Sequence, residues 1–388
     1  MNLDFDENEV AFRQEVREWL HAHLPRERRP LDGPDSVAYD RAWQRQQYDG
    51  GWAGIAWPKE YGGRGLSLTQ QLIWHEEYAR AKAPPIGNFF VAINHGGPTL
   101  ILRGTEEQKR YHLPRILRGE SIWCQGFSEP GAGSDLAGLR TRGVVDGAHL
   151  VVTGQKLWTS FAQHAQYQEL LVRTDPAAPR HDGLTWVICD MSLPGITVRP
   201  LLSMAGEYHC NEVFYDNVRI PLTHVVGEIN AGWSVAMCTL SLERGVSLIA
   251  RQIGLAQKIE ELVELARHQP ATDGSGPAIR DHEVAYRLAT LRAEIAAMRS
   301  MTYSAISRAR RENVPGPEGA MIALYYAEIT QRLCRLAMDI LGPVALHLPE
   351  PDSLSWEYLN SFKATIAGGT AEIRRNIIAE RVLGLPKA

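Results

Sequence analysis

The chain has few cysteines and no long apolar run, and both absences narrow the class of protein. Its 388 residues include five cysteines, scattered between Cys124 and Cys334 without a Cys-x-x-Cys pair. An odd, dispersed set is typical of reduced thiols in the cytoplasm. No run approaches the roughly 18 apolar residues of a membrane span, and the acidic N-terminus lacks the apolar segment of a signal peptide. We therefore expect a cytoplasmic protein that does not enter a membrane.

Motifs for several other functions are missing as well. There is no Gly-x-Ser-x-Gly, which gives no support to hydrolases with a nucleophile elbow. His21 with His23, and His209 beside Cys210, lack a third ligand at a suitable spacing, so we expect no metal site. A net charge of -4 with mixed signs gives no reason to expect nucleic acid, and the dispersed arginines and lysines indicate solvated faces.

The sequence patterns follow the order helix, strand, helix. Up to about residue 120 apolar residues recur at helical spacing, and Pro25 ends the first such helix. Strands then dominate as far as about residue 227, with a hairpin over residues 144–152. The helical period returns afterwards, interrupted by a loop over residues 270–277. The length alone fits two or three domains, and the three blocks of the pattern give the expected bounds: residues 1–120, 121–227 and 228–388.

A glycine-rich stretch at residues 126–135 and a second block at residues 155–160 are the most informative features. Gly131 and Gly133 permit backbone angles that are closed to other residues, and they leave N–H groups free to approach a ligand. Hydroxyl groups and a flat ring with one N–H donor accompany them, namely Ser128, Ser134 and Trp158. This combination suits an extended cofactor with phosphate and a large ring system; the alternative is a surface turn beside a strand.

The two blocks together resemble the paired FAD-binding blocks of the acyl-CoA dehydrogenase family. Further similarities at residues 57–65, 105–114 and 368–373 extend the resemblance over essentially the whole chain. It implies an α+β fold with an N-terminal helical domain, a middle β-barrel-like domain and a C-terminal four-helix bundle. It also implies oxidation of an acyl-CoA thioester to the trans-2-enoyl-CoA, with the electrons passed to an electron-transfer flavoprotein.

The resemblance implies one non-covalent FAD per chain in a homotetramer. Arg267 and Gly342 would reach the cofactor of a neighbouring subunit, although the family's Arg-x-x-Phe-Gly and Gly-Gly-x-Gly stretches are otherwise replaced here. Thr370 also has a second interpretation as the N-cap of the last long helix. The residues carried over as FAD contacts are Gln125, Phe127, Ser128, Ser134, Trp158, Thr159, Ser160, Arg267, Gly342, Thr370 and Glu372.

The catalytic base is expected at an unusual place. Removing the proton α to a thioester carbonyl needs a carboxylate with a raised pKa in a dry pocket. Many family members place this glutamate immediately before the Gly-Thr that opens the last helix, where this chain has Gly368. Resemblance to a smaller set, which includes isovaleryl-CoA dehydrogenase, points instead to Glu243 on an earlier helix. The alternative is a structural ion pair of Glu243 with Arg244 or another cation.

The substrate is expected to lie near Ser134, Arg244 and Gly368, the last acting through its backbone N–H on the thioester oxygen. The small residues at 367–369 leave room for a branched or bulky acyl chain. Other hypotheses stay open. They are an acyl group on a carrier protein in place of coenzyme A, a flavin monooxygenase or oxidase on the same fold, and a non-catalytic subunit of a mixed assembly.

Overall fold

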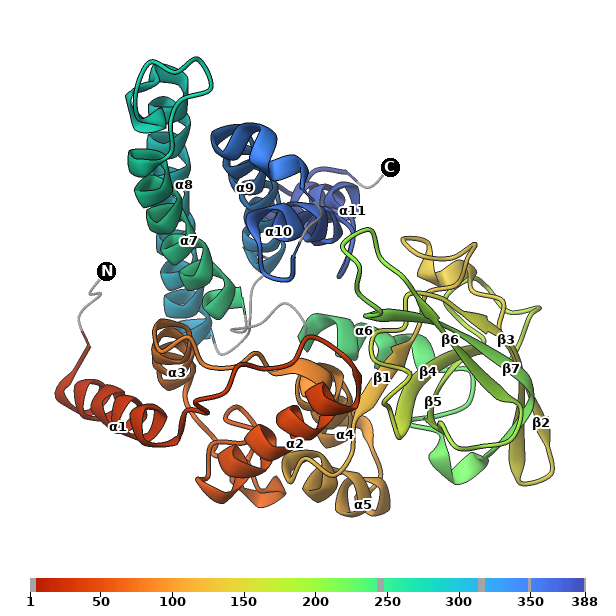
Figure 1. The fold of residues 1–388 in the computed structure, drawn as a ribbon. Helices are drawn as coiled ribbons and strands as arrows, with labels where there is room; N and C mark the ends of the chain where they lie inside the picture. The colour runs from red at the N-terminus through yellow and green to blue at the C-terminus, as the bar shows by residue number, and fades with distance from the viewer. Residues whose placement is uncertain (1–4, 243–247, 313–317, 348–349, 387–388) are drawn as a thin grey trace. The chain divides into compact units, whose positions relative to one another are not determined.

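The computed structural model describes residues 5–242, 248–312, 318–347 and 350–386. The chain divides into two compact units (Figure 1). Residues 25–66 and 84–243 form one, called the β unit here because it contains the sheet, and residues 1–24, 67–83 and 244–388 form the other, the helical unit. Within the described residues no helix is both long and apolar enough to cross a membrane.

The helices of the β unit begin at capping residues and bury one face. The Thr105 hydroxyl accepts a hydrogen bond from the N–H of Gln108, and the Gln108 side chain accepts one from the N–H of Thr105. The two bonds form a capping box. Asp32 caps a second helix that has proline in its first turn. The described α-helices of this unit are α2 (Gly33–Asp49), α4 (Gly97–Arg103), α5 (Glu106–Leu117) and α6 (Gly232–Leu242).

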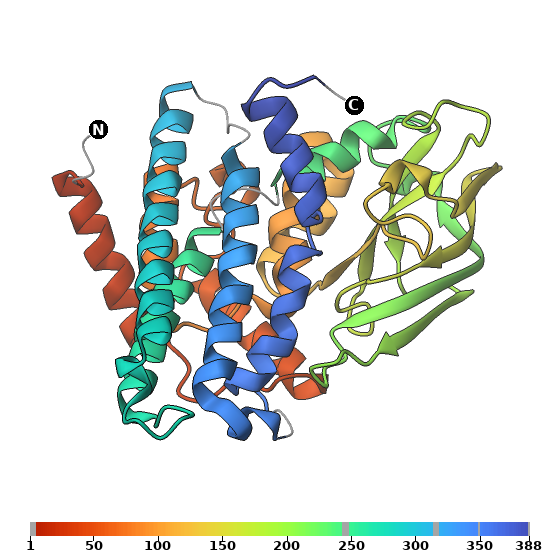
Figure 2. The same cartoon turned by 90° about the horizontal axis from the view of Figure 1, so that it is seen from above.

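The sheet of the β unit runs in the order β1-β4-β2-β3-β7-β6, with β5 paired to β4. Its strands are the yellow and green arrows of Figure 2. The predicted hairpin is confirmed, because Val144 pairs with Val151 and Gly147 turns with a φ of 58°. Pairing is parallel between β1 and β4 and antiparallel along β2-β3-β7-β6. The strands are β1 (Trp123–Gly126), β2 (Arg142–Asp146), β3 (His149–Lys156), β4 (Tyr167–Arg173), β5 (Leu184–Asp190), β6 (Ile196–Leu201) and β7 (Cys210–Pro221).

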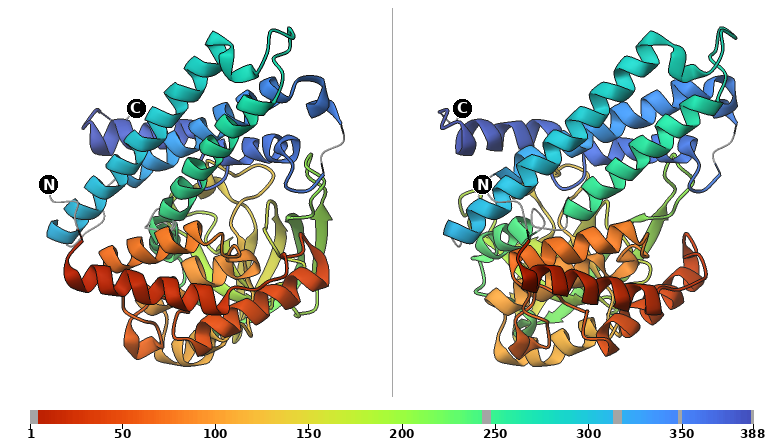
Figure 3. Two further views of the ribbon diagram at one scale, coloured as in Figure 1. Left: turned by 60° about the vertical axis from the view of Figure 1, so that its left-hand side comes forward. Right: turned by 90° about the vertical axis from the view of Figure 1, so that its left-hand side faces the viewer.

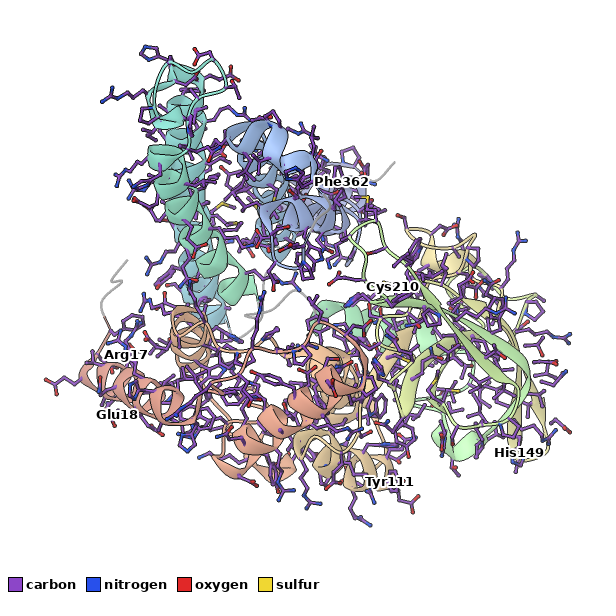
Figure 4. All side chains as sticks on the ribbon, viewed as in Figure 1. Arg17, Glu18, Tyr111, His149, Cys210 and Phe362 are labelled. Carbon is purple, nitrogen blue, oxygen red and sulfur yellow. The ribbon has the colours of Figure 1, made fainter. Side chains whose placement is uncertain are left out.

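A bulge in β7 keeps its apolar residues on the inner face. Val213 and Tyr215 are buried before it, and Val218 is buried after it, so the inward positions change from odd to even. Cys210 and His149 mark opposite ends of this part of the sheet (Figure 4), since His149 pairs with the last residue of β7. The bulge therefore lets one long strand serve a single core.

The helical unit is built around a long helical hairpin. The helices α7 and α8 run side by side (Figure 3), and the buried apolar residues of both pack with those of α9 in one core. The predicted loop between them is confirmed, because Pro270 and Pro277 form a bridge at its neck. The described α-helices of this unit are α1 (Glu7–His23), α3 (Leu68–Arg80), α7 (Leu248–His268), α8 (His282–Glu312), α9 (Glu318–Leu341), α10 (Leu354–Ser361) and α11 (Ala371–Ile377).

Buried carboxylates attach the first helices to this bundle. Glu76 on α3 accepts from Arg13 of α1 at 2.8 Å and from Arg299 of α8 at 3.3 Å. Glu77 beside it accepts from Arg17 at 2.6 Å (Figure 4 labels Arg17 on α1). Because these carboxylates are buried and each has more than one cation, the network ties α1, α3 and α8 together. The domain boundaries at residues 120 and 227 stay sequence predictions.

Candidate cofactor and substrate site

The two sequence blocks meet at a backbone hydrogen bond. The N–H of Leu157 donates to the carbonyl oxygen of Ser128 at 2.9 Å. Ser128 follows β1, and Leu157 follows β3, so each block is the loop that leaves a strand of the sheet. The fold therefore places the glycine-rich loop beside the Trp158 segment, as a shared cofactor site requires.

A buried ion pair between Lys156 and Glu129 stabilises this junction. The Lys156 ammonium lies 2.9 Å from the Phe127 carbonyl oxygen and 2.8 Å from Oε1 of Glu129. The Glu129 carboxylate also accepts the backbone N–H groups of Arg140 and Thr141, at 2.7 and 2.8 Å. The Glu129 carboxylate thus joins the start of the glycine-rich loop to the segment at Arg140 and Thr141 that follows it. The Lys156 ammonium joins the same loop to β3.

Burial and pairing act in opposite directions on the two charges. Burial lowers the pKa of Lys156 to about 8, against the smaller effect of Glu129. Burial also tends to raise the pKa of Glu129, but Lys156 and the hydrogen bonds outweigh it and lower that pKa below its ordinary value. The carboxylate is better compensated than the ammonium because it accepts from three donors, whereas the ammonium has two acceptors. At neutral pH both groups are charged.

The second block presents an exposed ring on a strained backbone. The Trp158 side chain is 63% exposed, and its φ is 61°, a region that residues other than glycine rarely occupy. Thr159 is fully buried, and its backbone pairs with that of Asn211 in both directions at 3.0 Å. Its hydroxyl oxygen is buried without a hydrogen-bond partner among the described residues. Ser160 lies next, 3.9 Å from Cys210 between their Oγ and Sγ atoms.

The two loop glycines matter because they lack a side chain, and not because of their backbone angles. Neither Gly131 nor Gly133 has a positive φ, so the expectation of special backbone angles is wrong. A Cβ built at either position would meet no atom within 4 Å. Side chains are therefore absent where the loop faces open space, which leaves the backbone approachable by a ligand.

Two predicted contacts point their side chains inward. Phe127 is 4% exposed and belongs to the hydrophobic core, so its backbone rather than its ring is open to a ligand. Gln125 donates to Oε1 of Glu169 at 2.7 Å, and Nδ1 of His95 lies 3.4 Å from the same oxygen. The fully buried Glu169 carboxylate thus orients the amide group of Gln125.

The helical unit holds the other predicted cofactor residues. The N-cap interpretation of Thr370 is confirmed, since its hydroxyl accepts from the Ile373 N–H at 3.3 Å. Glu372 lies in the first turn of the same helix. Arg267 is exposed and pairs with Glu264 at 3.1 Å, and Gly342 turns with a φ of 59° after α9. All four of these residues belong to the helical unit.

A buried arginine braces the turn before α11. Gly368 and Gly369 both have positive φ, at 67° and 101°. The Arg374 guanidinium donates to the carbonyl oxygens of Ala364 at 3.1 Å and Ala367 at 2.7 Å. The arginine holds the carbonyl side of the turn, and the glycine backbone can adopt angles that most side chains would oppose.

The predicted base and its neighbour, Glu243 and Arg244, lie outside the described residues. The helix that precedes them, α6, can be described. Its most buried side chains are Val235, Ala236 and Thr239, whereas Trp233 and Leu240 are only partly buried against the core. The hydroxyl group of Thr239 is accommodated in this buried face by a 2.9 Å hydrogen bond to the hydroxyl group of Thr99.

Comparison with known proteins assigns the family. The acyl-CoA dehydrogenase N-terminal, middle and C-terminal domain models match residues 6–120, 124–218 and 230–383. The chain belongs to the acyl-CoA dehydrogenase family, and with it to the oxidoreductases that act on acyl-CoA. The three-domain fold expected from the sequence, with helical domains on either side of a curled sheet in the chain, is confirmed.

Several relatives match over nearly the full length. The chain is 42% identical to acyl-CoA dehydrogenase IpdE1 of Mycobacterium tuberculosis, with 97% of each chain covered, and 26% identical to mitochondrial isovaleryl-CoA dehydrogenase of Pongo abelii, with 96% and 88% covered. Among solved structures, "Tcur3481-Tcur3483 steroid ACAD" is similar with a TM-score of 0.84 and 32% identity over both full chains. The ChsE4-ChsE5 complex of Mycobacterium tuberculosis is similar with a TM-score of 0.80 and 32% identity, again over both full chains.

The family is FAD-dependent, and the residues at the junction fit a flavin. An exposed indole beside an open glycine loop suits stacking on a large planar ring. The buried Thr159 hydroxyl offers a polar group that its own chain leaves unused among the described residues. A backbone strained at Trp158 is typical of a functional site. Trp158, Thr159 and Ser160 would hold the ring system, and Ser128 and Ser134 would contact the rest of the cofactor.

The residues that support this site were not predicted from the sequence. Lys156 follows Leu150 and Val152 at even spacing on β3, and this alternation could have predicted that it points inward. An inward lysine needs a carboxylate, which the loop supplies as Glu129. Arg374 carries no such signal, because its three acceptors are backbone carbonyl groups, which every residue type has.

Proposed function

We propose that this protein dehydrogenates an acyl-CoA thioester between its α and β carbons, with FAD as the cofactor. The observation that carries the proposal is the junction of Ser128 with Leu157, which sets the exposed Trp158 ring beside the open glycine loop. Bound FAD supplies a ring that accepts a hydride from the β-carbon. The chain's own residues bind and orient the reactants and move the α-proton.

Glu243 is proposed to take the α-proton. The place before Gly-Thr at the start of α11 holds Gly368, which has no side chain and cannot act as a base. The N–H of Gly368 is proposed to donate to the thioester oxygen, where negative charge gathers as the proton leaves. The Arg374 bonds that brace this turn support such a fixed donor, because a preorganised group costs no rearrangement during the reaction.

The acyl group is proposed to be bulky and ring-containing. Ala367, Gly368 and Gly369 leave space at the position where other family members project a glutamate. A solved relative at 32% identity is named a steroid ACAD, which supports a fused-ring acyl group for this chain. Electrons are proposed to pass on to an electron-transfer flavoprotein.

The assembly is proposed to complete the cofactor site with a second subunit. Arg267 and Gly342 are proposed to contact a neighbour's FAD, in a homotetramer. Two solved relatives are named as pairs of different chains, which makes a heteromer the alternative. Native mass spectrometry of the protein purified alone separates the two, because a chain that needs a different partner would not form the FAD-loaded tetramer by itself.

Anaerobic reduction of the bound flavin tests the function. A panel of straight, branched and fused-ring acyl-CoA thioesters should bleach the flavin absorbance of the wild type, most rapidly with the ring-bearing members. Glu243→Gln keeps the size of the side chain and removes its basicity, so the rate should fall by at least about 10²–10⁴-fold with FAD content unchanged. A normal rate in this variant would exclude Glu243. Absence of bleaching with every thioester, together with oxygen uptake driven by NADH and a flavin reductase, would favour a monooxygenase.

A further inference from the structure

The proposed flavin contact Gln125 lies against two buried polar residues that take no part in the proposed reaction. The parallel pairing of β1 with β4 sets Gln125 directly beside Glu169 (Figure 1). Paired residues of neighbouring strands point their side chains to the same face of the sheet, so these two side chains meet. Glu169 is fully buried there, and His95 is buried beside it. All three residues belong to the β unit.

Close packing brings His95 to this strand. His95 lies in a π-helical turn, Ala92–Gly96, that leads into α4. A Cβ built on Gly96 would lie 2.9 Å from the Trp123 ring, so a side chain at this position would push the turn away from β1. Trp123 begins β1, two residues before Gln125. Because π-helical turns are frequent at functional sites, this turn supports a role for His95 beside the strand.

Hydrogen-bonding chemistry sets the direction of the Gln125 amide. Its Nε2 lies 2.7 Å from Oε1 of Glu169 and 3.4 Å from Nδ1 of His95. Since a carboxylate only accepts hydrogen bonds, the amide NH2 group must face Glu169, and Oε1 of Gln125 is turned away from it. This oxygen accepts no hydrogen bond within the described part of the chain, and the side chain is only partly buried. Gln125 therefore presents an unused acceptor in a fixed orientation.

A flavin offers such an acceptor one specific donor. The polar edge of an oxidised flavin ring carries carbonyl oxygens and bare ring nitrogens, which accept hydrogen bonds, and a single N–H group, at N3, which donates. The backbone N–H groups of the open glycine-rich loop suit the accepting atoms. The N3–H group needs an acceptor instead, because a buried donor without a partner weakens binding. Gln125 is well placed to supply it, since the next residue, Gly126, begins the glycine-rich stretch.

We propose that Glu169 is a positioning residue for the flavin: it holds the Gln125 amide so that Oε1 accepts a hydrogen bond from the N3–H group of the ring. His95 lies close to both groups and limits their movement. The inference rests on FAD as the cofactor of the proposed function, and it assigns one atom of the chain to one atom of the ring. It requires Gln125 to act through its side chain and not only through its backbone.

Competition between FAD and 3-methyl-FAD, which lacks the N3–H donor, tests the proposal. The FAD-loaded protein is equilibrated with both flavins, and mass spectrometry of the bound flavin gives the ratio of the two affinities. The wild type should prefer FAD by at least about tenfold, because the analogue leaves the Gln125 oxygen without its donor. Gln125→Met keeps the length of the side chain and removes the acceptor, so this variant should bind the two flavins within about twofold of each other.

Glu169 is tested by a pair of variants. Glu169→Leu removes the group that holds the amide, so the preference for FAD should fall as far as in Gln125→Met. Glu169→Gln keeps an oxygen that can accept from the Gln125 amide, so its preference should stay within about twofold of the wild-type value. A positioning role predicts this rescue by the conservative variant.

The matched control is Asp40→Leu. Asp40 is another buried carboxylate of the β unit that holds an amide, with Nδ2 of Asn88 at 2.7 Å, and its described hydrogen bonds reach only Asn88 and Arg29. Asp40→Leu should lower the melting temperature and keep the wild-type preference for FAD. A fall of the preference in this control would show that loss of stability alone changes the ratio, and would overturn the assignment to Glu169.

The proposal would also be overturned by a wild type that binds both flavins equally. The same holds for a wild-type preference that persists in Gln125→Met and Glu169→Leu, which would assign the N3–H group to a backbone carbonyl group. Weaker binding of both flavins by Gln125→Met, with an unchanged ratio, would move the contact to a ribityl hydroxyl group and exclude the ring. Failure of the proposed function gives a different result: the preference would be present and sensitive to these variants, but no acyl-CoA would reduce the flavin.

Discussion

Lys156 and Glu129 form an ion pair inside the β unit, with Nζ 2.8 Å from Oε1 and the lysine fully buried. The pair links the last residue of β3 to the loop that follows β1, and so links the two sequence blocks on which the cofactor site is based. A buried pair is costly to form, but losing one member is costlier still because it leaves an uncompensated charge. The geometry of the loop therefore depends on both residues.

Glu129→Gln should destabilise the folded protein by about 3–5 kcal/mol, because it leaves the Lys156 ammonium buried without its carboxylate. Urea unfolding of the FAD-free protein measures this change in the free energy of unfolding. The control is Asp146→Asn, which breaks an exposed pair with Arg219, with side chains 62% and 52% exposed, and should cost less than about 1 kcal/mol. Equal effects of the two substitutions would show that the buried pair does not fix the loop.

The same pair predicts how stability depends on pH. Burial lowers the pKa of Lys156 from 10.5 to about 8. Between these values the unfolded chain binds more protons at this residue than the folded chain, so rising pH stabilises the fold through this group. The wild type should therefore gain up to about 3 kcal/mol relative to Lys156→Met between pH 8 and 10.5. Parallel curves of the free energy of unfolding against pH would contradict the assignment.

The fold was predictable from local patterns, and the site only from a resemblance. Alternation predicts the hairpin of β2 and β3, and the Pro270 to Pro277 loop follows from its composition. The sequence does not reveal the bulge in β7. The extra residue shows only in the strand pairing, where the buried positions change from odd to even numbers after Tyr215.

Packing explains the expectations that were wrong. Gly131 and Gly133 were expected to adopt special angles, but the structure uses their missing side chains instead. The hydrogen bond between the buried Thr239 and Thr99 on another helix is likewise invisible to periodicity, because the two residues are distant in the sequence. Clusters assembled from distant segments, such as Gln125 with His95 and Glu169, require the fold itself.

Trp158→Ala should weaken FAD binding by about tenfold, because it removes the exposed ring proposed to lie against the flavin. The stability of the FAD-free protein should change by less than about 0.5 kcal/mol, since a side chain that is 63% exposed contributes little to the core. Fluorescence titration of the FAD-free protein with FAD gives the affinity. Tyr286→Ala serves as the control, because Tyr286 is 71% exposed on α8 and should leave the affinity unchanged. Unchanged affinity in Trp158→Ala would remove this ring from the site.

Arg374→Gln should slow flavin reduction by about tenfold to hundredfold, because it releases the carbonyl groups of Ala364 and Ala367 and loosens the turn that presents the Gly368 N–H. The change should affect kcat more than KM, since the donor matters most when charge gathers on the thioester oxygen. Arg375→Gln is the matched control, because Arg375 is exposed and pairs only with the Glu328 carboxylate among its described side-chain bonds.

A thioester without hydrogens on its β-carbon, such as 3,3-dimethylbutanoyl-CoA, separates the proton step from the hydride step. Exchange of its α-protons with deuterated water should slow in Arg374→Gln by the same factor as flavin reduction, although no hydride can be transferred. A purely structural role would lower the melting temperature and leave exchange by the remaining folded protein at the wild-type rate. That result would separate Arg374 from the thioester oxygen and limit it to holding α11 in place.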